Sequence, residues 1–102
     1  MQTLKVQCIE HQAAGINTFE FVDPAGNPLP PFTAGAHIDV HLPGGFIRQY
    51  SLCNSPHERH RYVVGVLNVA DGRGGSQSLH NNVKVGDLIQ ISEPRNHFPI
   101  VE

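Results

Sequence analysis

The stretch GAHIDVHLPGGFIRQYSL (residues 35–52) holds two strand-like runs on either side of a Pro-Gly-Gly turn. The first run puts its apolar and polar residues on opposite faces of an extended chain: Ile38, Val40 and Leu42 against His37, Asp39 and His41. The second run covers residues 46–52. Because so short a loop cannot carry a parallel crossover, we expect the two strands to form an antiparallel hairpin.

Strand signals continue on both sides of this hairpin. Four further segments have the length and composition of strands: residues 4–11, 16–22, 61–67 and 88–92. Residues 71–87 form the one convincing helical stretch, with Leu79 and Val83 four apart and a stop at Gly86-Asp87. The ten glycines and eight prolines favour short strands and turns. We therefore expect a mostly β fold, a small closed or nearly closed antiparallel barrel with one late helix.

Length and composition restrict the class of protein. A chain of 102 residues with 39% apolar content fits one domain, residues 1–102. The net charge of -2 and the scattered Lys and Arg argue against a nucleic-acid partner. No apolar run reaches membrane-spanning length, and residues 1–30 do not follow a secretory signal pattern. We expect a soluble cytoplasmic protein without a membrane partner.

The two cysteines, Cys8 and Cys53, lie far apart in the sequence. In a chain without a secretory signal we expect buried free thiols rather than a disulfide. A plant-type iron–sulfur cluster needs four thiolates, so this chain cannot hold one by itself.

The segment DGRGGS (residues 71–76) opens the expected helix. Glycines let main-chain N–H groups approach a ligand closely, and the first turn of a helix favours an anion such as phosphate. The segment matches neither the Walker pattern nor the dinucleotide-binding glycine pattern. Taken alone, such a segment is more often an ordinary flexible turn than a phosphate site.

Residues 48–51 bring three kinds of ligand-binding group together. On a strand, Arg48 and Tyr50 project to one side and Ser51 to the other. A phosphate suits Arg48, a planar heterocycle stacks on an aromatic ring, and a hydroxyl can bond a ring nitrogen. The candidate ligand is a flavin.

Three stretches, in this order and spacing, resemble a known family: PFTAGAHIDVHLPGGFIRQYSLCN (31–54), RYVVGVLNVADGRGGS (61–76) and SEPRNHFPI (92–100). They are similar to the flavin domain of ferredoxin-reductase-type oxidoreductases, within the phthalate dioxygenase reductase and vanillate demethylase reductase group. The resemblance covers most of the chain. It implies a six-stranded antiparallel Greek-key barrel with one capping helix and a flavin along one edge.

The resemblance also implies roles for individual residues. Arg48 would neutralise the flavin phosphate, Tyr50 would pack on the flavin, and Ser51 would hydrogen-bond its redox-active nitrogen. Two further groups would contact the pyrimidine edge and the phosphate, respectively: the main chain of Val66, Leu67 and Asn68, and the helix start at Gly74, Gly75 and Ser76. Residues 94–96 resemble the stretch that leads to a nicotinamide-binding domain, although Glu93 stands where a small residue is expected.

The expected cofactor is FMN, with FAD as the alternative. In this group NAD(P)H reduces the flavin, which passes electrons to a 2Fe-2S centre that serves a terminal oxygenase. We therefore expect an NAD(P)H-dependent flavin oxidoreductase module whose nicotinamide-binding and ferredoxin-like domains are absent from this chain. By itself the module should not complete the reaction.

Two alternative readings remain open from the residues alone. His37, Asp39 and His41 share one face of a strand and could bind a transition metal with a fourth ligand. The domain could also be a non-catalytic barrel that binds a protein partner and holds no flavin.

Overall fold

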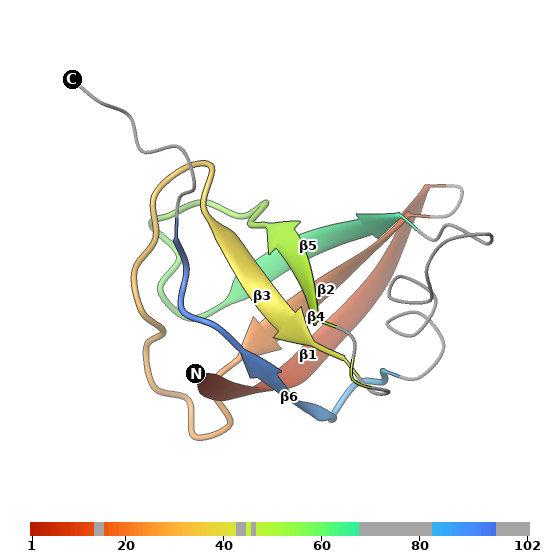
Figure 1. Cartoon of the computed structure of the whole chain (residues 1–102), viewed down its shortest axis with the longest axis horizontal. Helices are drawn as coiled ribbons and strands as arrows, with labels where there is room; N and C mark the ends of the chain where they lie inside the picture. Colours follow the sequence, from red (N-terminus) through yellow and green to blue (C-terminus); the bar gives the residue numbers. More distant parts are fainter. Residues whose placement is uncertain (14–15, 43–44, 46, 68–82, 96–102) are drawn as a thin grey trace.

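Six strands make up the regular structure of this chain. The computed structural model describes residues 1–13, 16–42, 45, 47–67 and 83–95 (Figure 1). The strands are β1 (Gln2–Ala13), β2 (Ile16–Val22), β3 (His37–His41), β4 (Ile47–Ser51), β5 (Tyr62–Leu67) and β6 (Leu88–Ile91). All six strands expected from the sequence are present, with ends that differ by one or two residues in most cases.

The strands form one antiparallel sheet in the order β4-β3-β6-β1-β2-β5. The expected hairpin of β3 and β4 is confirmed, with Ile38 opposite Tyr50 and Val40 opposite Arg48. The last strand, β6, lies between β1 and β3 and so connects the two halves of the sheet. Residues far apart in the sequence therefore become neighbours.

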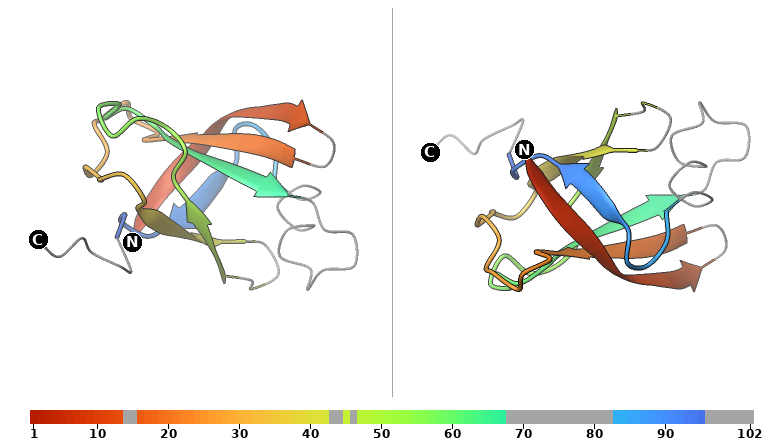
Figure 2. Two further views of the ribbon diagram at one scale, coloured as in Figure 1. Left: turned by 90° about the horizontal axis from the view of Figure 1, so that it is seen from above. Right: turned by 90° about the horizontal axis from the view of Figure 1, so that it is seen from below.

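The curled sheet is not closed (Figure 2). Its two edge strands, β4 and β5, are joined in the described part of the chain by one isolated bridge, between Leu52 and Val64. Beside this bridge the N–H of Cys53 donates to the carbonyl of Val63 at 2.7 Å. The expected six antiparallel strands are thus confirmed, whereas the fully closed barrel is not, because the β4 and β5 edges diverge from this point. The expected helix lies largely outside the described residues.

The apolar side chains line the inside of the curled sheet. The most completely buried are Leu4, Val6, Phe19, Phe21, Ile38, Val40, Tyr62, Val64, Val66 and Ile91. Burying such side chains contributes about 1.5–3 kcal/mol each. The faces expected for β3 are confirmed, since Ile38 and Val40 are buried while the polar residues between them stay half-exposed. No helix in the described ranges is long and apolar enough to span a bilayer.

The turn before β6 is fastened to β1 by main-chain hydrogen bonds. Gly86 has a φ of +97°, a conformation that favours glycine. Its N–H donates to the carbonyl of Val6 at 2.8 Å, and the N–H of Val6 donates to the carbonyl of Asp87 at 2.9 Å. The turn at Gly86-Asp87 therefore aligns β6 with β1.

Tyr62 anchors the long connection between β2 and β3. Its side chain is fully buried, and its ring meets Phe32 edge-on at a centroid distance of 5.8 Å. Its hydroxyl donates to the carbonyl of Pro30 at 2.6 Å. Since Pro30 and Phe32 belong to that connection, the contacts hold it against the start of β5.

Tyr62→Phe is expected to lower the free energy of unfolding by about 1 kcal/mol, because the carbonyl of Pro30 loses its donor. Urea unfolding checks this value. Tyr50→Phe is the matched control, since none of the described hydrogen bonds uses that hydroxyl. Equal stability of the two variants would contradict the anchoring role of Tyr62.

Candidate functional site

The β4 strand presents the predicted ligand-binding side chains at an edge of the sheet. Arg48 and Tyr50 are half-buried, while Ser51 is exposed on the opposite face. Because they are paired with Val40 and Ile38, Arg48 and Tyr50 share the face that β3 turns toward the core. Tyr50 packs against that core. The alternation expected for these three residues is therefore confirmed.

The charge of Arg48 acts on the Tyr50 phenol. Burial raises the pKa of Tyr50 above its usual range, and the nearby Arg48 guanidinium partly offsets this rise. One guanidinium nitrogen, Nη1, donates to the carbonyl of Ile47 at 3.1 Å. A cation and an aromatic ring thus lie together on the inner face of the edge strand.

The β5 strand turns main-chain groups toward β4. The N–H of Val63 donates to Asn54 Oδ1 at 3.0 Å, and its carbonyl accepts from Cys53 at 2.7 Å, so both groups point away from β2. Main-chain direction alternates along an antiparallel strand. The corresponding groups of Gly65 and Leu67 therefore also point away from β2.

The same reasoning applies to β4. The N–H of Leu52 donates to the carbonyl of Ala36, on the β3 side, at 3.0 Å. Alternation then directs the main chain of Ser51 away from β3 and toward β5. We call the meeting of the two edges at Leu52, Cys53, Val63 and Val64 the seam. Beyond the seam the two strands spread apart (Figure 2).

The structure thus places five of the predicted site residues on the two strands that meet at the seam: Arg48, Tyr50, Ser51, Val66 and Leu67. Four others, Asn68, Gly74, Gly75 and Ser76, lie outside the described residues. The side chain of Val66 is buried, and alternation directs its main chain toward β2. Gly65 and Leu67 are the described β5 residues after Val63 whose main-chain groups point away from β2.

Gly65 was missed by the sequence reasoning. A Cβ atom there would meet only Cys53 Sγ, at an ordinary 3.8 Å, so packing within the protein does not require a glycine. The available signal was a glycine interrupting an apolar strand, which is typical of close approach by a ligand or another backbone.

The metal-binding alternative is wrong. In the described ranges no three His, Cys, Asp or Glu side chains are grouped to hold a metal ion. Asp39 instead pairs with Arg95, whose Nη2 lies 2.6 Å from Oδ2. The physical reason is the rise of a strand, which sets His37 and His41 about 13 Å apart along its axis.

Both cysteines are free, as expected, but neither is fully buried. Cys8 is half-buried, whereas Cys53 is exposed because it follows the edge strand at the seam. The pKa of the Cys8 thiol is raised by desolvation and by its hydrogen bond to the Glu10 carboxylate. Cys8 therefore stays a protonated thiol rather than a reactive thiolate.

The segment after β6 is fixed to the start of β3. The N–H of Arg95 donates to the carbonyl of His37 at 3.0 Å, and the N–H of His37 donates to the carbonyl of Arg95 at 2.8 Å. The exposed Glu93 lies between these pairs and β6. The chain thus leaves the sheet along a defined path beside β3.

Comparisons with known proteins find relatives that match nearly the whole of this chain. No protein-family model matches the sequence. The chain is 56% identical over 90 residues to vanillate O-demethylase oxidoreductase of a Pseudomonas strain, covering 88% of this chain and 28% of that protein. It is 48% identical over 99 residues to the reductase subunit of the Aquincola tertiaricarbonis tert-butanol monooxygenase, covering 97% and 29%.

A solved structure matches equally well. Phthalate dioxygenase reductase, described as modular and as transferring electrons from pyridine nucleotides to a 2Fe-2S centre, superposes with a TM-score of 0.94. The identity is 46%, and the match covers 99% of this chain and 32% of that one. The chain therefore spans about 30% of the length of the relatives it matches.

The antiparallel sheet and these matches liken the chain to one β region of modular electron-transfer reductases. Within that class, it corresponds in sequence and fold to one region of vanillate O-demethylase oxidoreductase and phthalate dioxygenase reductase.

Arg48→Ala is expected to raise the pKa of the Tyr50 phenol, because the tyrosinate loses a neighbouring positive charge. The two tyrosines can be titrated separately by NMR of ring-labelled protein. Tyr62, whose pKa is raised by its own burial, serves as the internal control and should titrate as before. A lowered or unchanged Tyr50 pKa would show that the guanidinium lies elsewhere.

Proposed function

We propose that this chain is the flavin-binding module of an NAD(P)H-dependent oxygenase reductase, with FMN as its cofactor. The supporting observation is the pairing of the β4 and β5 edges at the seam. This pairing brings the strand that carries Arg48, Tyr50 and Ser51 next to β5, whose Gly65 and Leu67 turn main-chain groups away from β2.

The residues present fit a phosphorylated planar heterocycle. A guanidinium pairs strongly with phosphate oxygens, which suits Arg48. The half-buried ring of Tyr50 offers an apolar surface for the flavin. Main-chain N–H and carbonyl groups on β5 complement the alternating donors and acceptors of a pyrimidine edge. Phosphate, ring and ring edge therefore each have a partner of matching chemistry.

When bound, FMN accepts a hydride and releases single electrons, while the protein binds it and tunes it. Arg48 neutralises the phosphate. Tyr50 packs beside the ring, held by its own contact with the core. Ser51 donates a hydrogen bond to the redox-active ring nitrogen and so favours its reduced, protonated form.

The electron path extends beyond this chain. We place a nicotinamide-binding domain before FMN in the electron path and a ferredoxin-like domain with a 2Fe-2S centre after it, serving a terminal oxygenase of aromatic compounds. The fixed exit at His37 and Arg95 supports a defined direction toward a following domain. The cytoplasmic location stays a prediction.

FMN is proposed over FAD because a single terminal phosphate suffices for Arg48 together with the helix start expected from the sequence at Gly74, Gly75 and Ser76. Those three residues and Asn68 keep their proposed roles from the family resemblance. Tighter binding of FAD than of FMN would overturn this choice.

Flavin binding by the purified chain tests the proposal, with riboflavin as the matched ligand without a phosphate. The chain should bind FMN and quench its fluorescence. Arg48→Ala is expected to weaken FMN about tenfold or more, because a charge-assisted contact is lost, and to leave riboflavin within about twofold. Lys5→Ala, on β1 and away from the seam, is the control for lost positive charge. Equal losses for both flavins would remove Arg48 from the phosphate site.

Ser51→Ala is expected to lower the two-electron midpoint potential of bound FMN. Loss of a hydrogen bond worth about 1 kcal/mol to the reduced form corresponds to about 20 mV. Spectroscopic titration against a reference dye measures the shift. The control is Ser55→Ala, since that serine lies in the β4–β5 loop and its hydroxyl accepts only from His57 among the described hydrogen bonds. An unchanged potential would contradict the role given to Ser51.

A further inference from the structure

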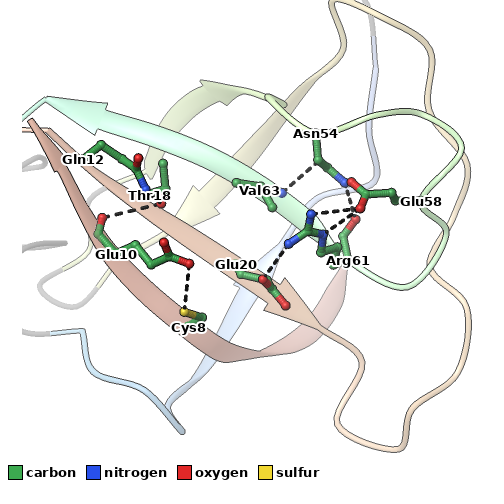
Figure 3. Close-up of polar contacts among 9 residues, drawn as sticks. All are labelled: Cys8, Glu10, Gln12, Thr18, Glu20, Asn54, Glu58, Arg61 and Val63. Carbon is green, nitrogen blue, oxygen red and sulfur yellow. Dashed lines mark hydrogen bonds and ion pairs between the residues drawn. The ribbon is translucent and has the colours of Figure 1, made fainter.

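The side chain of Asn54 extends the seam beyond the last main-chain contact (Figure 3). Its Oδ1 accepts the N–H of Val63 at 3.0 Å, and its Nδ2 donates to the carbonyl of Arg61 at 3.0 Å. These two main-chain groups lie at the start of β5, on the side away from β2. Asn54 thus pairs with β5 in the way that one more residue of β4 would.

The β5 end of this contact is itself held in place by ion pairs. The guanidinium of Arg61 reaches Glu20 on β2 at 2.9 Å and Glu58 in the β4–β5 loop at 2.9 Å (Figure 3). The pKa of Glu58 is lowered by hydrogen bonding to Arg61 and, to a smaller extent, to Asn54. The main chain at the start of β5, to which Asn54 is hydrogen-bonded, is therefore held to both β2 and the loop.

Asn54 lies three residues after Ser51, with the bridge residue Leu52 and the main-chain donor Cys53 between them. This short segment is the covalent connection between the Asn54 contact with β5 and Ser51, which faces Gly65 across the seam. The ligand groups proposed above lie on both sides of the seam.

We propose that Asn54 is a positioning residue for the flavin: it sets the spacing between Ser51 and the outward main chain of β5. This inference rests on the proposed function and adds a residue that does not touch the cofactor. An asparagine amide suits this role because it carries a donor and an acceptor side by side, whereas alanine carries neither and aspartate, when ionised, lacks the donor.

The test compares two variants that each remove side-chain hydrogen bonds to the main chain. Asn54→Ala is expected to weaken FMN about tenfold and to shift the visible circular dichroism of the bound flavin. Ser92→Ala is the matched control, because Ser92 Oγ accepts the N–H of Asp39 at 2.8 Å where β6 ends beside β3. It should lose comparable stability and keep the FMN affinity and spectrum of the unmodified chain.

The outcomes separate the two proposals. If the unmodified chain binds no FMN, the proposed function fails, and the role of Asn54 fails with it. If it binds FMN but both variants change affinity and spectrum alike, only the positioning role of Asn54 is overturned. Should Asn54→Ala not fold, Asn54→Asp keeps the size and the acceptor for Val63. It is expected to give a smaller loss of affinity with a spectral shift in the same direction, and an unchanged spectrum would overturn the inference.

Discussion

The meeting of β4 and β5 at the seam is the contact on which the candidate site depends. Without it, Ser51 and Gly65 would belong to opposite edges of a six-stranded sheet. The Leu52–Val64 bridge and the hydrogen bond from Cys53 to Val63 make these edges neighbours. Main-chain alternation then turns groups of both strands toward the same space. The candidate site is formed largely by the main chain of two strand edges, with few ligand-binding side chains.

Polar contacts at the edge of the core and within it keep that arrangement in register. Arg61 connects β2 to the β4–β5 loop, and Tyr62 holds the β2–β3 connection from inside. Exposed ion pairs contribute little to stability individually. Their contribution here is geometric, since each fixes a loop that leads into or out of an edge strand.

Much of the fold could be predicted because alternating apolar and polar residues identify its strands. The alternation in residues 37–42 and the tight turn after it were sufficient to pair β3 with β4. The position of β6 between β1 and β3 could not be derived from local pattern, since pairing of distant strands depends on the whole core. The same limit explains why the incomplete closure of the sheet was not predicted. It also explains why a metal site was considered. Spacing shows that His37, Asp39 and His41 share a face, but not that Asp39 binds Arg95.

For the candidate site, the residues of β4 were identified from their chemistry, and their directions followed from strand geometry. The resemblance assigns the β5 contribution to the main chain of Val66, Leu67 and Asn68, because the sequence does not reveal which main-chain groups pair with β2. Only the hydrogen bonds of Val63 establish the alternation that favours Gly65 and Leu67. Asn54 could not be identified from the sequence for a similar reason: its hydrogen-bond partners are main-chain atoms, which leave no signal in the sequence.

The central place of β6 bears on how a nascent chain acquires this fold. While the ribosome has released only residues up to β5, β3 and β4 can form a hairpin, and β1, β2 and β5 can form a three-stranded sheet. Among the described strands, it is β6 that pairs with both subassemblies. Since the seam needs their mutual alignment, we expect it to form only after β6 has left the exit tunnel.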